Sequence, residues 1–128
     1  MEYRKFTRLP LFVVVELHLA DGSRHYGETA DLSLDGAFVK FHPPKDIAVR
    51  QECVLDLIIT TQEGWVRTEL KCQIAHIRDE GVGVRFHAAS IAGHEAFIKL
   101  LMEGHSDVEQ LLEEMGSHPS GDFQYQDD

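Results

Sequence analysis

Residues 66–74 show a strict alternation of side chains, which an extended strand with one buried face accommodates. Apolar or small side chains occupy every second position, and charged or polar ones lie between them. The first set is Val66, Thr68, Leu70, Cys72 and Ile74, and the second is Arg67, Glu69, Lys71 and Gln73. Because successive side chains of a strand point to opposite faces of a sheet, this pattern predicts a strand between core and solvent.

Five further segments have strand character, which extends the prediction to a six-stranded sheet. They cover residues 11–19, 24–32, 37–41, 52–61 and 82–86. Asp21 and Gly22 form a hairpin signal between the first two, because glycine adopts the positive φ of a tight turn. A sheet of this size with one buried face tends to close on itself. We therefore expect a mainly β fold, a six-stranded antiparallel barrel with C-terminal helices.

The C-terminal part of the chain predicts two helices and a polar tail. Ser90 is placed to cap a helix that stops at Gly104, and Ser106 with Glu109 resembles the capping box of a shorter helix. The tail is polar and acidic and contains proline and glycine, which is typical of a mobile segment. We expect a barrel with its arm and first helix over 1–104, a second helix over 105–116 and a mobile acidic tail over 117–128.

The charge of the chain limits its partners. Twelve basic residues against 22 acidic ones give a formal net charge of −10, which disfavours nucleic acid polymers and anionic membranes. No apolar run approaches the ~20 residues that span a bilayer, and no signal-like segment follows Met1. Two cysteines build no disulfide framework. We therefore expect a cytoplasmic protein without membrane insertion.

Motifs typical of enzymes are missing from the sequence. It contains no G-x-S-x-G, no H-E-x-x-H and no phosphate loop of the G-x-x-x-x-G-K type. None of the eight histidines lies two or four residues from another, so no metal-ligand spacing stands out. Cys53 and Cys72 both fall on inward faces, where cysteine acts as a small core residue. We expect no catalytic activity, no metal and no cofactor.

Two short polar segments carry chemistry suited to a guanine nucleotide. Arg4 and Arg8 lie in a basic N-terminal arm, and guanidinium groups bind phosphate oxygens or the guanine edge. Asp31 and Ser33 lie at a strand end, where a carboxylate and a hydroxyl pointing the same way can accept from guanine N–H groups. Gly36 would supply a positive φ for the following turn. Each segment alone is more simply explained as a solubilising tail or an ordinary turn.

Together, in this order and spacing, the segments resemble the PilZ domain. The resemblance rests on R-x-x-x-R at 4–8, D-x-S-x-x-G at 31–36 and Gly-Val-Gly-Val-Arg-Phe at 81–86, and covers roughly residues 3–102. PilZ domains are bacterial receptors for cyclic di-GMP on a six-stranded split barrel. The resemblance implies that Arg4 and Arg8 hold phosphates and guanine edges, that Asp31 and Ser33 read a guanine, and that Gly36 forms the turn. To these we add His76 as a ring that could stack on a base, although an exposed histidine at a strand end is the simpler explanation.

The resemblance implies a non-enzymatic sensor that passes the level of cyclic di-GMP to an unidentified effector protein, as a monomer or weak dimer. The C-terminal helices are candidates either to dock on that partner or to fold back over the barrel. An alternative is a PilZ-like interaction module that binds no nucleotide, as in type IV pilus assembly. An enzyme on a small split barrel, for instance a flavin-dependent one, has no residue set to support it.

Overall fold

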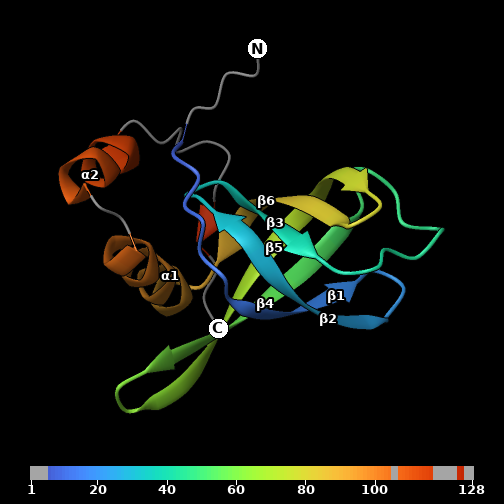
Figure 1. The fold of residues 1–128 in the computed structure, drawn as a ribbon, viewed down its shortest axis with the longest axis horizontal. Helices are drawn as coiled ribbons and strands as arrows, with labels where there is room; N and C mark the ends of the chain where they lie inside the picture. Colours follow the sequence, from blue (N-terminus) through green and yellow to red (C-terminus); the bar gives the residue numbers. More distant parts are fainter. Residues whose placement is uncertain (1–5, 105–106, 117–123, 126–128) are drawn as a thin grey trace.

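The computed structural model describes residues 6–104, 107–116 and 124–125, and within them six strands form a closed antiparallel barrel (Figure 1). The strands are β1 (Val14–Leu19), β2 (Arg24–Leu32), β3 (Gly36–Lys40), β4 (Glu52–Thr61), β5 (Gly64–Arg78) and β6 (Gly81–Ala89). They lie in the order β3-β2-β1-β4-β5-β6, and β3 pairs with β6 to close the barrel. The helices α1 (Ile91–Gly104) and α2 (Val108–Gly116) follow. The predicted fold is confirmed.

Alternate side chains of the strands fill the barrel. Leu17, Leu55 and Leu70 are among those with no exposed surface. The alternation on β5 holds as predicted with one exception, Val66, which is 43% exposed. The β4–β5 hairpin extends beyond its neighbours, because β1 pairs with β4 only as far as Ile58 and β6 with β5 only from Leu70 onward (Figure 1). Val66 therefore lies past the end of the barrel.

Local signals place the turn and the first helix as predicted. Gly22 adopts φ 90°, and its amide donates to the carbonyl of Leu19. Ser90 Oγ accepts a hydrogen bond from the amide of Gly93 and caps α1. The predicted cap of α2, Ser106, lies outside the described residues, and Asp107 Oδ1 instead accepts from the amide of Gln110.

Gly36 is required for a reason other than the one we predicted. Among the described glycines, positive φ occurs at Gly22 and Gly64, so the expected positive φ at Gly36 is wrong. Gly36 begins β3 beside β6, and a Cβ at this position would lie 2.3 Å from the carbonyl oxygen of Val84. Close approach of two strands, rather than a left-handed backbone, therefore excludes a side chain here.

Two residues of the expected mobile tail are placed in the structure. Gln124 and Tyr125 form β7, which pairs in parallel with Ala88 and Ala89 at the end of β6. The Tyr125 hydroxyl also lies 3.0 Å from Nδ1 of His94 on α1. For these two residues the pairing differs from the expected mobility. The rest of 117–128 lies outside the described residues, where the expectation stays a prediction.

Candidate functional site

The N-terminal arm is held against the end of β2. The amide of Leu9 donates to the carbonyl of Leu32 at 2.7 Å, and the amide of Leu32 donates back to Leu9 at 2.9 Å. Phe6 and Leu9 are buried, so apolar side chains anchor the arm on both sides of Thr7 and Arg8. The arm therefore delivers Arg8 to the strand end that carries the D-x-S-x-x-G segment.

Arg8 and Asp31 form an ion pair that joins the two predicted segments. Arg8 Nη1 lies 3.1 Å from Asp31 Oδ1, and the two side chains are 26% and 29% exposed. A bulge in β2 between Thr29 and Asp31 shifts the register there. The amide of Phe38 on β3 also donates to Asp31 Oδ1, at 3.3 Å. Both bonds end on Oδ1, so Oδ2 takes no hydrogen bond from a described residue. Arg4 lies outside the described residues.

Ser33 and Gly36 shape the turn after β2. Ser33 is 1% exposed, and its hydroxyl donates to Asp35 Oδ1 at 2.7 Å. Its amide donates to the carbonyl of Gly36 at 2.9 Å, which closes the turn. The Ser33 hydroxyl is thus committed to Asp35 in this structure. Its role in reading a guanine together with Asp31 stays a prediction.

His76 and Phe38 form an aromatic platform beside the ion pair. Their ring centroids are 5.9 Å apart with an interplanar angle of 23°, a stacked arrangement. Both residues face Gly83 on β6, which pairs with Phe38 on one side and with His76 on the other. A Cβ on Gly83 would lie 2.1 Å from His76 Cε1, so glycine makes room for the imidazole ring. Asp31 pairs with Phe38, so Asp31, Phe38, Gly83 and His76 form a row across β2, β3, β6 and β5.

Phe38 is a residue of the candidate site that sequence reasoning missed. In the strand pattern of residues 37–41, Ala37 and Val39 face the core and are buried, whereas Phe38 faces outward and is half-buried. An outward aromatic residue two positions after the D-x-S-x-x-G segment was the available signal. Its neighbour His76 was predicted, but their contact depends on the β3–β6 closure, which no local pattern reveals.

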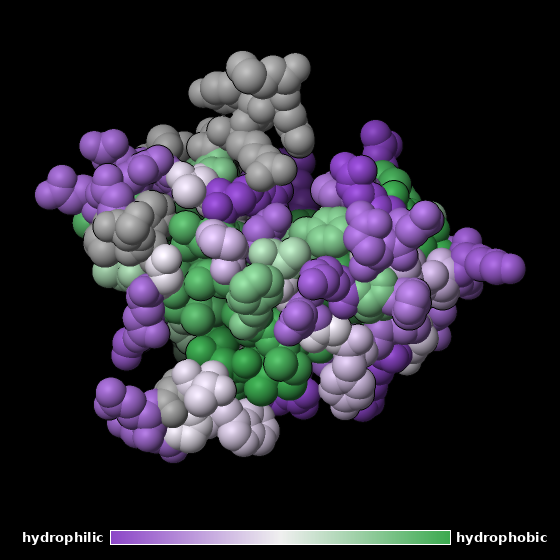
Figure 2. All heavy atoms as spheres, viewed as in Figure 1, coloured by the Kyte–Doolittle hydropathy of each residue, from purple (hydrophilic) through white to green (hydrophobic). Residues whose placement is uncertain are grey.

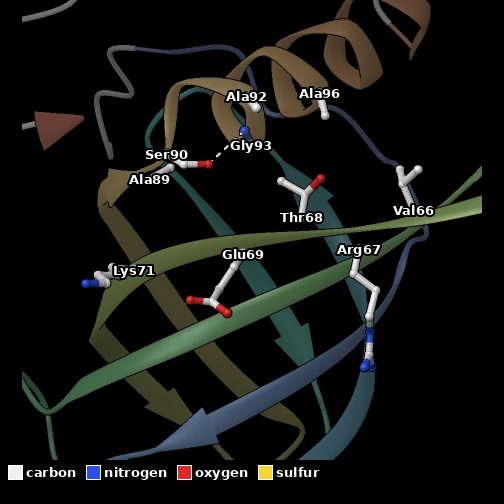
Figure 3. A pocket seen from close by; sticks show the side chains of 10 residues that line it. All are labelled: Val66, Arg67, Thr68, Glu69, Lys71, Ala89, Ser90, Ala92, Gly93 and Ala96. Atoms are coloured by element: carbon white, nitrogen blue, oxygen red, sulfur yellow. Dashed lines mark hydrogen bonds between the residues drawn. The ribbon is translucent and has the colours of Figure 1, made fainter. Parts of the chain in front are cut away.

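A separate pocket of about 580 Å³ lies between β5 and the start of α1 (Figure 3). In Figure 3, Thr68 points toward the helix, whereas Arg67 and Glu69 point away from it. Figure 2 shows apolar side chains gathered in the middle of one face, next to the projecting hairpin, with hydrophilic side chains around them. The lining of the pocket includes neither Arg8 nor Asp31, so it is distinct from the row described above.

The two cysteines lie together in the core, as their inward positions predicted. Cys53 and Cys72 are buried, paired across β4 and β5, with their Sγ atoms 3.3 Å apart as free thiols. The hydrogen bond between the two thiols and burial raise the pKa of the Cys72 thiol well above its usual range, which disfavours the reactive thiolate. The described residues contain no cluster of three metal-ligating side chains. Neither described helix combines the length and apolarity needed to cross a membrane.

A family model describes this geometry. The PilZ domain model matches residues 2–103, which span the arm, the barrel and nearly all of α1. The chain belongs to the PilZ domain family. The predicted resemblance is therefore confirmed over the segment that carries Arg8, Asp31 and His76. No curated protein matches the chain at a significant level.

Solved PilZ structures share the fold at low sequence identity. The PilZ domain of CeSA from a cellulose-synthesizing bacterium matches with a TM-score of 0.63 at 22% identity, covering 76% of this chain and 96% of its own. The Escherichia coli YcgR PilZ domain with c-di-GMP matches with a TM-score of 0.60 at 17% identity, covering 92% and 100%. The Bacillus subtilis inhibitor of motility, MotI/DgrA, gives 0.66 at 9% identity, covering 93% and 55%.

Proposed function

We propose that this PilZ domain is a non-enzymatic receptor for cyclic di-GMP that passes the presence of the ligand to a partner protein in the cytoplasm. The Arg8–Asp31 ion pair carries the proposal, because it places a guanidinium group and a carboxylate within 3.1 Å of each other at the meeting point of the two motifs. Family membership and the c-di-GMP in the YcgR PilZ structure support it.

Each side chain has a chemical task in this proposal. Arg8, together with Arg4 four residues earlier in the sequence, binds phosphate oxygens and the O6/N7 edge of guanine. Asp31 accepts hydrogen bonds from the guanine N1–H and N2–H groups, for which Oδ2 is the oxygen without a partner among the described residues. Ser33 adds a hydroxyl once it leaves Asp35, while Gly36 keeps the turn tight.

The aromatic platform holds the flat face of a base. His76 lies at the exposed end of the platform, and Phe38 lies between His76 and Asp31. A purine stacked on this pair lies next to the carboxylate that reads its edge. Aromatic stacking adds about 0.5–1.5 kcal/mol beyond burial, a useful share of the ~8 kcal/mol of a micromolar complex. Charge-assisted hydrogen bonds of roughly 1.5–3 kcal/mol each supply the remainder after the arm is ordered.

Isothermal titration with two cyclic dinucleotides tests the proposal. Cyclic di-GMP and cyclic di-AMP share the same phosphate ring, but adenine carries an acceptor at N1 where guanine carries a donor. We expect micromolar binding of cyclic di-GMP and at least about tenfold weaker binding of cyclic di-AMP, because Asp31 accepts from the guanine edge alone. Asp31→Asn, which replaces one acceptor oxygen by a donor, should reduce this preference.

The same titration decides between the receptor and the interaction module. Equal affinity for both dinucleotides would show that the bases are not read and would contradict the role of Asp31. Silence of the wild-type chain at tens of micromolar cyclic di-GMP would favour a PilZ-type interaction module without a nucleotide.

A further inference from the structure

The short helix α2 contacts the ligand-binding arm directly. The Thr7 amide donates to Glu114 Oε1 at 3.1 Å, and the Thr7 hydroxyl donates to Glu114 Oε2 at 2.5 Å. Gln110 Nε2 donates to Thr7 Oγ1 at 3.1 Å and to Glu114 Oε2 at 3.2 Å. Leu111 on the same helix is 2% exposed and belongs to the core cluster. α2 is thus docked by the apolar side chains of Leu111 and the partly buried Met115, and by a polar clamp on Thr7 of the arm.

The clamped residue lies inside the R-x-x-x-R segment. Thr7 immediately precedes Arg8, whose side chain reaches Asp31. The Glu114 carboxylate lies 3.1 Å from the Thr7 amide, and neighbouring Cα atoms are about 3.8 Å apart, so the carboxylate lies within the ~8 Å screening length of the Arg8 backbone. The Glu114 carboxylate bonds to Thr7, and the proposed phosphate contact is the adjacent Arg8, so the two anions would occupy neighbouring positions on the arm.

The negative charge of α2 also opposes a phosphate bound at the arm. Its nine residues include three glutamates and neither lysine nor arginine. A cyclic dinucleotide brings two negatively charged phosphates to the arm, where like charges repel across a partly solvated surface. A bound ligand therefore disfavours the docked helix, and the docked helix disfavours the ligand to the same extent.

We propose that α2 is an autoinhibitory lock on the arm: Glu114 and Gln110 hold Thr7 in the ligand-free protein, and cyclic di-GMP displaces the helix when it binds. This inference rests on the proposed function, since it assigns the regulation of the same site. Displacement uncovers Leu111 and leaves an acidic amphipathic helix free to contact another protein. The ligand affinity of the full chain is accordingly lower than that of a chain whose lock is broken.

The test compares two glutamates on the same helix. Glu114→Ala removes the clamp, whereas Glu113→Ala removes the same charge from an exposed position one residue earlier. By isothermal titration with cyclic di-GMP, we expect Glu114→Ala to bind about tenfold more tightly than wild type, or about 1.4 kcal/mol. Glu113→Ala should stay within about twofold, a bound set by screening of an exposed charge. Thr7→Val, which removes the hydroxyl of the clamp, should tighten binding in the same direction.

Amide hydrogen exchange over residues 109–116 gives a second readout. Saturating cyclic di-GMP should accelerate exchange in α2 of the wild type, and Glu114→Ala should accelerate it without ligand. Unchanged α2 protection in a ligand-bound wild type, with Glu114→Ala no tighter than wild type, would overturn the lock and leave the receptor standing. Equal tightening by both glutamate variants would show that the loss of any negative charge on α2 raises the affinity. That result would also overturn the lock. Absence of binding in wild type and every variant would remove the receptor function and the lock together.

Discussion

Arg8 and Arg67 both bind carboxylates on the outside of the barrel, but their ion pairs lie in different surroundings. Arg67 on β5 reaches Asp56 at 3.2 Å and Glu16 at 3.5 Å, whose side chains are 13% and 4% exposed. Arg8 reaches Asp31 from a separate arm, and that carboxylate is 29% exposed. The first cluster is enclosed by three adjacent strands, so little of either acid is open to a ligand. The second is open on one side.

The enclosed cluster of Arg67, Glu16 and Asp56 takes its partners from the sheet. A hydrogen bond from Tyr26, aided by the charges of His18 and Arg67, lowers the pKa of Glu16 below its ordinary value, against the opposing effect of burial. Burial raises the pKa of Asp56, although Arg67 opposes the shift. An ion pair is a candidate binding site when one of its members can exchange its partner for a ligand. The more exposed Asp31 makes the Arg8 pair the candidate for such an exchange, whereas the two acids bound by Arg67 are largely covered.

Replacing each arginine in turn gives the largest expected loss of ligand affinity. Arg8→Ala should weaken cyclic di-GMP binding at least tenfold, about 1.4 kcal/mol, because a charge-assisted phosphate contact is lost. It should barely change the urea midpoint, since a half-exposed ion pair contributes about 0–1 kcal/mol. Arg67→Ala should do the reverse: a lower urea midpoint, and affinity within about twofold of wild type because Arg67 lies outside the site. Titration and urea unfolding of both variants check this.

One outcome for Arg67→Ala would contradict this expectation. If Arg67→Ala lost cyclic di-GMP binding while its urea midpoint stayed unchanged, the enclosed cluster would be a ligand site and the distinction drawn above would be wrong.

Two glycines in the candidate site differ in what an added Cβ would contact. At Gly36 a Cβ would meet the backbone oxygen of Val84, whereas at Gly83 it would meet the flexible ring of His76. Gly36→Ala should therefore destabilise the fold by about 1–3 kcal/mol, because two strands must separate. Gly83→Ala should cost less stability, because a side chain can rotate away. Urea unfolding of the pair measures the difference, and equal midpoints would show that the β3–β6 contact yields easily.

The aromatic platform should have a smaller effect. His76→Ala should weaken cyclic di-GMP binding about two- to tenfold, the range that 0.5–1.5 kcal/mol of stacking implies. Titration checks this, with His42→Ala as the matched control, since His42 is an exposed loop histidine that belongs to neither the platform nor the arm. An unchanged affinity in His76→Ala would remove the platform from the site and leave the Arg8–Asp31 pair as its centre.

Features carried by short-range patterns were predictable. The alternation on β5, the turn at Gly22 and the cap at Ser90 depend on residues close in sequence, and the structure contains all three. The motif spacing also indicated that Arg8 and Asp31 meet, because family resemblance supplies long-range information that local patterns lack.

Features set by strand length and closure were not predictable. Val66 follows the inward pattern but lies on a hairpin that outruns its neighbours. Glu16 occupies an outward position, yet side chains from adjacent strands cover it to 3% exposure. The clamp of α2 on Thr7 joins residues more than 100 positions apart, and no periodicity encodes such a contact.

The smallest expected effect is a pH dependence of stability that separates Glu16 from Asp56. Because the folded-state pKa of Glu16 lies below its ordinary value of 4.5, its ionised form stabilises the fold above that value, and this contribution disappears as pH falls through the lower folded pKa. Asp56 has the opposite sign: its folded-state pKa lies above 3.8, so its protonated form favours folding below that value, and this is lost as pH rises through the folded pKa.

Urea midpoints between pH 6 and pH 3 should therefore show a deficit of Glu16→Gln relative to wild type that shrinks toward low pH. The corresponding difference for Asp56→Asn should move the other way, in favour of the wild type as pH falls. Slopes of the same sign for both variants would mean that Arg67, rather than the burial of Asp56, sets the balance in the enclosed cluster.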